Sequence, residues 1–159
     1  MTDFERTAPA FVEMAHRIVW ASVATVDGRE RPRSRVLHPY WELEDGKLVG
    51  WVGTGPTPVK VADLSARPFA SVSYWAPGHD TCQAECRAEL LFDPEVRTRV
   101  WNLFKAAPEP LGYDPAIIPV WSEPTADSFV VLRLDPYRLR VMAGEVMLKG
   151  VGEVLTWSE

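Results

Sequence analysis

Cysteine and long apolar runs are scarce in this sequence, and each scarcity excludes a class of protein. Two cysteines among 159 residues are too few for the disulfide framework of a small secreted domain. The longest uncharged apolar stretch, residues 18–26, is much too short to cross a bilayer as a helix. The first residues carry acids instead of the basic and apolar pattern of a signal peptide. We therefore expect a cytoplasmic protein without a membrane partner.

An excess of positive charge is missing as well. The formal net charge is -5, which argues against a general nucleic-acid binder but leaves room for a local basic site. No repeat, low-complexity tract or linker divides the chain, and its length suits one domain. We expect residues 1–159 to form a single domain. Within it, the pattern assigns no structure to the tail at 143–159.

Alternating and β-branched segments separated by turn signals dominate what is there. Asp-Gly pairs at 27–28 and 45–46 predict hairpin turns. We expect about seven strands, at 18–26, 31–43, 47–53, 68–75, 81–92, 128–136 and 137–142, and helices at 3–17, 58–67 and 93–107. Consecutive hairpins with few helices predict a mainly β, α+β fold, namely an antiparallel barrel decorated by helices.

The stretch at 50–68, GWVGTGPTPVKVADLSARP, combines glycines, prolines and the start of a helix. Thr57 is the N-cap candidate, and Pro58 suits the first turn. A helix N-terminus attracts an anion, to which Lys60 would add a charge and Thr54 and Thr57 hydroxyl donors. An ordinary turn before a capped helix is the competing interpretation.

Two common nucleotide motifs are excluded in this stretch. A P-loop requires serine or threonine after the lysine, where this chain has Val61. The dinucleotide fingerprint requires a glycine at the position of Pro58 and a parallel βαβ unit around it. Upstream, Arg33 and Arg35 alternate on one face of a strand, so they either converge with Lys60 on one anion or remain solvated surface charges.

The order of these features resembles the pyridoxamine 5'-phosphate oxidase-like family, the FMN-binding split β-barrels. The resemblance rests on Arg35 near Val-Leu, Thr54 at a strand end, Lys60 on a short helix, Ala-Arg-Pro at 66–68 and Cys-Arg-Ala-Glu-Leu at 86–90. The chain departs from the oxidase itself, which usually has arginine where Val59 stands and carries a C-terminal substrate-binding segment. Vitamin B6 chemistry is therefore not expected.

The resemblance implies a homodimer with flavin bound at the subunit interface. Thr54 and Lys60 would hold the phosphate, while Arg35, Val36 and Leu37 would line the isoalloxazine ring. The cofactor would be FMN or, as in many relatives, the deazaflavin coenzyme F-420. The implied activity is hydride transfer between the flavin and a small organic substrate. A flavin- or haem-binding module without turnover is the alternative, and the sequence identifies no catalytic acid or base.

Three further side chains are candidates for a substrate wall. His38 lies on the proposed flavin strand, Trp75 ends its strand, and Trp121 lies in the long proline-rich loop at 108–125. Loops of this length in compact domains often form binding loops or lids. A structural role in the core or on the surface is the competing interpretation for each of the three.

The spacing of His79, Cys82 and Cys86 invites comparison with a metal site. On an extended strand, however, residues four apart lie about 13 Å from each other, too far for tetrahedral coordination of one zinc ion. We expect no metal here, and we expect the two cysteines to be small core or interface residues.

Overall fold

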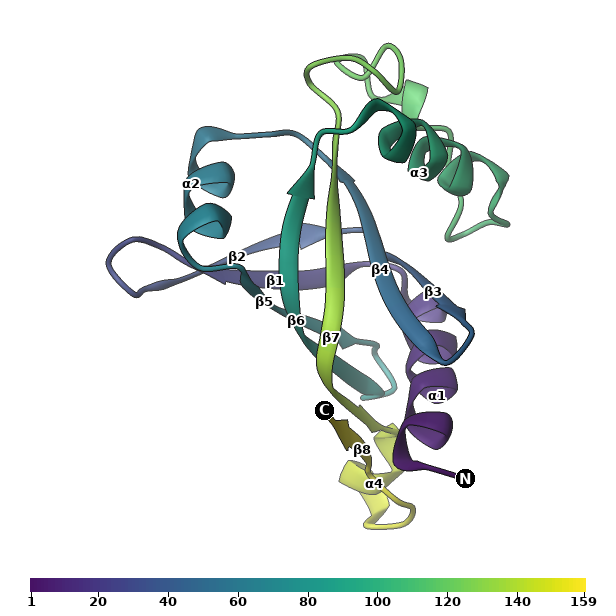
Figure 1. Cartoon of the computed structure of the whole chain (residues 1–159). Coiled ribbons are helices and arrows are strands. Elements are labelled where there is room, and N and C mark those ends of the chain that lie inside the picture. Colours follow the sequence, from purple (N-terminus) through teal and green to yellow (C-terminus); the bar gives the residue numbers. More distant parts are fainter.

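The computed structural model describes residues 1–159 as a curved sheet with four α-helices around it (Figure 1). In chain order, the elements are α1 (Asp3–Ile18), β1 (Ala21–Val26), β2 (Pro32–Leu37), β3 (Tyr40–Glu44), β4 (Lys47–Thr54), α2 (Pro58–Ala66), β5 (Phe69–Trp75), β6 (Thr81–Leu91), α3 (Pro94–Ala106), the 3₁₀ turn η1 (Pro115–Ile117), β7 (Val130–Met142), α4 (Gly144–Lys149) and β8 (Leu155–Ser158). None of the helices combines the length and the apolar character needed to span a membrane.

The sheet has eight strands in the order β2-β1-β5-β6-β7-β4-β3, with β8 added against β7. Every pairing is antiparallel. Although β2 and β3 follow each other in the chain, no ladder joins them, so the curved sheet is open between these strands. The predicted mainly β, α+β antiparallel fold is therefore confirmed, as an open barrel whose gap lies beside β2.

The larger core lies between the sheet and α1. This helix begins with a capping box between Thr2 and Glu5, and it buries Phe11, Met14 and Ala15 on one side. The fully buried side chains of Trp41 and Tyr74 meet beneath it, where the indole Nε1 donates to the phenolic oxygen at 2.8 Å. That bond satisfies both polar atoms inside an apolar core.

A smaller core joins α3 to β4 and β7. Its buried members are Trp51, Val100, Trp101, Phe104, Trp121, Phe129 and Val131. Trp121 comes from the long loop, and its ring packs edge-on against Phe129 with centroids 5.0 Å apart. This cluster therefore holds the 108–125 segment against the end of β4.

Several element boundaries differ from those the pattern predicts. The expected strand at 31–43 is broken at His38–Pro39 into β2 and β3, because proline restricts the residue before it and lacks an amide donor. The expected strands at 128–136 and 137–142 are one strand, β7. Residues 18–20 are not in a strand, since Ile18 still belongs to α1.

The C-terminal tail is ordered. Residues 144–149 form α4, and residues 155–158 form β8 along Arg138–Val141 of β7. Trp157 of β8 packs edge-on against Phe4 of α1 with ring centroids 4.8 Å apart. The tail thus ties the end of the sheet to the first helix.

Candidate functional site

A cavity of about 400 Å³ lies between the end of β2, the end of β4 and the long loop. Its volume falls within the usual range of small-molecule sites. None of its walls carries an aspartate, glutamate, lysine or arginine. The lining residues are Trp20, Val36, Leu37, His38, Gly53, Thr54, Pro110, Tyr113, Ile117, Ile118 and Trp121. This aromatic and aliphatic composition suits a planar, uncharged ring.

Positive charge stands immediately beside this apolar cavity. Lys60, in the first turn of α2, extends its ammonium to Thr54, whose hydroxyl oxygen accepts at 2.6 Å, and to the carbonyl oxygen of Gly55 at 2.9 Å. No carboxylate forms an ion pair with Lys60. Burial lowers the pKa of this ammonium, and the nearby charge of Arg35 lowers the pKa further. An anion bound here would relieve both penalties.

Arg35 contributes a second cation from β2. One guanidinium nitrogen donates to the Thr25 hydroxyl at 2.8 Å and to the carbonyl oxygen of Val23 at 3.2 Å, both on the neighbouring strand β1. Partial burial lowers the pKa of the guanidinium, and the charge of Asp63 offsets part of that shift. Arg35 is thus positioned by neutral groups and has no direct ion pair.

Asp63 is the acidic residue nearest to these cations. Its side chain, on the inner side of α2, is only 8% exposed and lies 3.9 Å from Nε of Arg33. Its Oδ2 atom is buried without a hydrogen-bond partner. Arg33 also lies 3.7 Å from Asp27, so it faces the β1–β2 turn and does not line the apolar cavity.

His38 forms part of an aromatic wall. Its ring lies 5.0 Å from the rings of Trp20 and Tyr113, and 5.6 Å from that of Phe104, between centroids. Burial lowers the pKa of the imidazole, an effect partly offset by the backbone of Leu111. His38 is therefore neutral at neutral pH. Its Nε2 atom is buried and has no hydrogen-bond partner.

The structure brings together most of the residues predicted for the site. Val36, Leu37, His38, Thr54 and Trp121 line one cavity, and Lys60 lies beside it through its contact with Thr54.

Three of the predicted residues occupy other positions. The first is Arg33, which faces the β1–β2 turn as described above. Thr57 caps α2 by accepting from the backbone amide of Lys60, and it does not line the cavity. Trp75 ends β5 outside the cavity walls and packs edge-on against His79. The role of each predicted site residue remains a prediction.

Several cavity residues were not singled out by the sequence. Trp20 precedes β1 and gives no periodic signal of its own, whereas Tyr113, Ile117 and Ile118 belong to the long loop, whose length was the available clue. Gly53 also lines the cavity, and a Cβ there would come within 2.8 Å of the Phe129 ring. The small core therefore requires this glycine.

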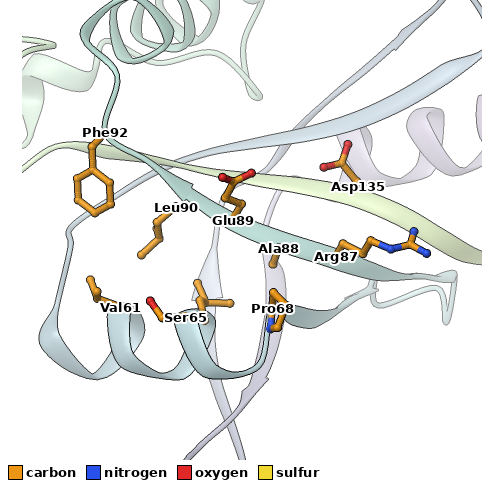
Figure 2. Close-up of a pocket in the computed structure, with 10 residues that line it drawn as sticks. Val61, Ser65, Pro68, Arg87, Ala88, Glu89, Leu90, Phe92 and Asp135 are labelled. Carbon is orange, nitrogen blue, oxygen red and sulfur yellow. The ribbon is translucent and has the colours of Figure 1, made fainter.

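A second cavity, of about 600 Å³, lies between α2 and β6. Figure 2 shows Val61 and Ser65 of α2 facing Leu90 of β6 across it. Two of its three charged residues form ion pairs, because Arg87 pairs with Glu159 at 2.7 Å and Asp135 with Arg133 at 2.9 Å, whereas Glu89 forms none. The charge that remains unpaired is a carboxylate, so this cavity is less suited to an anionic ligand than the surroundings of Lys60 are.

Comparison with known proteins gives structural likenesses. No protein-family model and no functionally curated protein matches this sequence. Among solved structures, a Clostridium acetobutylicum protein related to general stress protein 26 of B. subtilis, of the pyridoxinephosphate oxidase family, has a TM-score of 0.66 and 14% identity. The match covers 92% of this chain and 89% of that one.

Two further structures bear on the cofactor. A pyridoxamine 5'-phosphate oxidase-related, FMN-binding protein from Nostoc punctiforme has a TM-score of 0.64 and 18% identity, over 85% of this chain and 83% of that one. An F-420 reductase has a TM-score of 0.57 and 17% identity, over 81% of this chain and 94% of that one. The chain therefore has the fold of the pyridoxamine 5'-phosphate oxidase-related, FMN-binding proteins.

Proposed function

We propose that this protein is a flavin-dependent oxidoreductase that transfers hydride between FMN and a small organic substrate. The observation that carries the proposal is the junction of two unlike environments. A half-buried ammonium without a carboxylate partner, Lys60, stands directly beside an uncharged aromatic cavity. FMN has the same two parts, since it joins one terminal phosphate to a planar ring system.

The phosphate end fits the donors that are present. Lys60 would supply a charge-assisted hydrogen bond, and Arg35 would supply a second positive charge close by. The Thr54 hydroxyl accepts from Lys60 through its oxygen and keeps its own proton for donation to a phosphate oxygen. Together they neutralise a dianion at the mouth of the cavity.

The ring end fits the cavity walls. Val36 and Leu37 present strand backbone and aliphatic side chains, while Trp20, Tyr113 and Trp121 enclose the space with aromatic surface. When bound, flavin supplies hydride transfer, whereas the protein contributes orientation and the exclusion of water. Burial keeps His38 neutral, so it would offer a hydrogen bond to a ligand without adding a charge.

The cofactor choice between FMN and a deazaflavin depends on the same site. Structural neighbours include an FMN-binding protein and an F-420 reductase. We propose FMN because the cations at Thr54 match one phosphate, and coenzyme F-420 is the alternative. Titration of both cofactors into the same preparation distinguishes them by their dissociation constants.

We also propose a homodimer with the cofactor at its interface. Ser22 of β1 is paired with both Val36 of β2 and Ser73 of β5, so these three residues share one face of the sheet. Trp75 lies on this face two residues further on. Val36 is 66% exposed and Trp75 57%, although both are large apolar side chains. Because Val36 also lines the cavity, a second copy on this face would close it.

The decisive experiment is a binding titration followed by an activity assay. FMN and coenzyme F-420 are titrated into the purified protein, and the visible flavin band and fluorescence are recorded. We expect saturable binding of one cofactor. The holoprotein is then assayed with NADPH or the reduced deazaflavin and a panel of small acceptors. Binding of neither cofactor would refute the proposal, and binding without turnover would favour a carrier or sensor.

A further inference from the structure

Arginine occurs at every second position from residue 29 to residue 35. Arg33 and Arg35 belong to β2, and Arg29 and Arg31 lie in the turn that precedes it. Alternate residues of an extended chain point to the same side and lie about 6.5–7 Å apart. Arg33 and Arg35, both in β2, therefore point to the same side of the strand. Arg29 and Arg31 extend the positive charge into the adjoining turn, where Glu30 between them has a left-handed backbone with a φ of 63°.

Three of these arginines line a pocket that is separate from the apolar cavity. It has a volume of about 600 Å³ and lies between the β1–β2 turn and the first turns of α2. Its walls consist of Asp27, Gly28, Arg29, Arg31, Arg33, Pro58, Val59, Ala62 and Asp63. Val59, which takes the place of an expected arginine beside Lys60, is therefore one of its walls.

The charges in this pocket are not balanced. Asp27 is fully engaged, because its carboxylate accepts from the backbone amides of Arg29 and Arg31 and from the Arg31 side chain at 3.1 Å. The guanidinium of Arg29 has no hydrogen bond and no ion pair. Arg33 has only the long contacts of 3.7 and 3.9 Å with Asp27 and Asp63.

Asp63 is the other carboxylate of this pocket, and on its own it disfavours an anion there. Its side chain is more than nine-tenths buried, it faces this pocket, and its Oδ2 atom lacks a hydrogen-bond partner. Arg35, Lys60 and the residues that line the pocket comprise five cations and two carboxylates, a local charge of +3 in a chain whose net charge is -5, and Glu30 of the same turn does not line the pocket. Such a local field attracts anions strongly.

We propose that this pocket is a second anion-binding site, contiguous with the Lys60 site, for a ligand that bears several neighbouring phosphate or carboxylate groups. The proposal rests on the proposed function, in which Lys60 takes the first phosphate. A single phosphate at Lys60 leaves Arg29 and Arg31 without an anionic ligand, whereas a chain of anionic groups would extend from Lys60 to the arginines that line this pocket. The same chemistry belongs to an anionic extension of the cofactor and to a phosphorylated dinucleotide donor.

Calorimetric titration of inorganic probes tests the site itself. Tripolyphosphate and orthophosphate are titrated into the whole protein and into the variants Arg29→Gln, Arg29→Gln/Arg31→Gln and Lys60→Ala. Arg67→Gln, which removes one charge at the far end of α2 and outside the pocket, is the matched control. We expect Arg29→Gln to weaken tripolyphosphate about fivefold, as for a partly exposed ion pair, and the double variant to weaken it further.

The affinity for orthophosphate should fall in Lys60→Ala and stay unchanged in Arg29→Gln. If the two arginine variants bind tripolyphosphate as tightly as the parent and Arg67→Gln do, the second site does not exist. If Lys60→Ala binds orthophosphate as tightly as the parent does, the proposed function is undermined instead. The two failures are therefore distinguishable.

Titrations and assays with organic ligands show whether the anionic groups belong to the cofactor or to a dinucleotide. If the site receives an extension of the cofactor, Arg29→Gln should weaken the binding of coenzyme F-420, whose phosphate is followed by further acidic groups, more than the binding of FMN. It should raise the KM for NADPH at unchanged cofactor affinity if the site receives a dinucleotide. If neither quantity changes, the pocket attracts inorganic anions only and the proposal fails.

Discussion

At the scale of single residues, the site depends on an ammonium that lacks an anionic partner. Lys60 is held by two neutral oxygens, those of Thr54 and Gly55, although a half-buried lysine normally requires a counter-charge. The arrangement lowers its pKa in the free protein. An anionic ligand would therefore gain from a charge that the fold has already positioned.

Replacement of this lysine should separate binding from folding. We expect Lys60→Ala to weaken FMN binding by about 1.5–3 kcal/mol, because a charge-assisted hydrogen bond is lost. Thermal unfolding should change little, since the Thr54 hydroxyl remains in the polar mouth of the cavity. Lys105→Ala, in the last turn of α3, is the control for the loss of one surface charge. Unchanged FMN affinity in Lys60→Ala would contradict the phosphate assignment.

The lowered pKa of Lys60 predicts how FMN affinity depends on pH. The phosphate binds the protonated ammonium, so affinity is highest well below the pKa of Lys60 and falls as the pH rises through it. Because burial and Arg35 lower that pKa from 10.5, the fall should begin at a lower pH than for an ordinary lysine. Fluorescence titrations from neutral to alkaline pH measure it. Lys60→Arg, which keeps its charge, should abolish the fall in this range.

The sequence predicts the site residues that local chemistry determines. Thr54 and Lys60 were identified because a strand end, a turn and a capped helix follow each other within a few residues. Trp20 was missed because its place in the cavity depends on a loop more than ninety residues away. Trp75 is predicted for the same wall, but it pairs with Thr81 at the end of the β5–β6 ladder, outside the cavity. This position follows from the assembled sheet and not from the local sequence.

At the scale of elements, the 108–125 segment forms the outer wall of the cavity. Trp121 anchors it in the small core, and the amide of Tyr113 donates to the carbonyl oxygen of Phe104 in α3 at 3.0 Å. Gly112 is required at this junction, because a Cβ there would lie 1.8 Å from the carbonyl oxygen of Ala107. The segment therefore has a defined conformation although it carries only one short 3₁₀ turn.

Ile117 tests whether this wall contacts the ring. It lines the cavity and is 70% exposed, so Ile117→Asp should fold normally. A carboxylate at this position disfavours an apolar ring, and we expect riboflavin affinity to fall by about tenfold or more, which is about 1.4 kcal/mol. Riboflavin lacks the phosphate and so isolates the ring contribution.

Val120→Asp is the matched control for this experiment. Val120 belongs to the same loop and is 67% exposed, but it does not line the cavity. It should bind riboflavin as the parent does. If the two variants bind riboflavin with equal affinity, the loop does not contact the bound ring.

The differences between the predicted and the observed strands have physical causes. The Asp135-Pro136 pair predicts the end of a strand, yet β7 continues through it. The register between β6 and β7 shifts at Glu85–Cys86, and this irregularity accommodates a proline, which donates no hydrogen bond to the neighbouring strand. β8 was not predicted, because its four residues are stabilised by pairing with Arg138–Val141 and by the contact of Trp157 with Phe4. These stabilising contacts come from distant residues, so the sequence of the segment alone does not predict the strand.

At the scale of the whole molecule, one face of the sheet is unusually apolar for a surface. Val36 and Trp75 lie on the shared face of β2, β1 and β5, with the small residues Ser22 and Ser73 between them. Small side chains flanked by large apolar ones allow close approach of a second copy. The gap of the open barrel lies beside β2, so that copy would also cover the mouth of the cavity.

Trp75 provides the test of this assembly, because it lies on the face but outside the cavity walls. We expect Trp75→Asp to shift the protein from twice the chain mass to the 17.9 kDa of one chain, as measured by light scattering after gel filtration. FMN affinity should fall in the same variant, since the second copy no longer closes the cavity. Met147→Asp, which alters an exposed apolar residue on α4, controls for the added charge and should change neither quantity. If Trp75→Asp becomes a monomer with full FMN affinity, one chain is sufficient for the site, and the interface has no part in holding the cofactor.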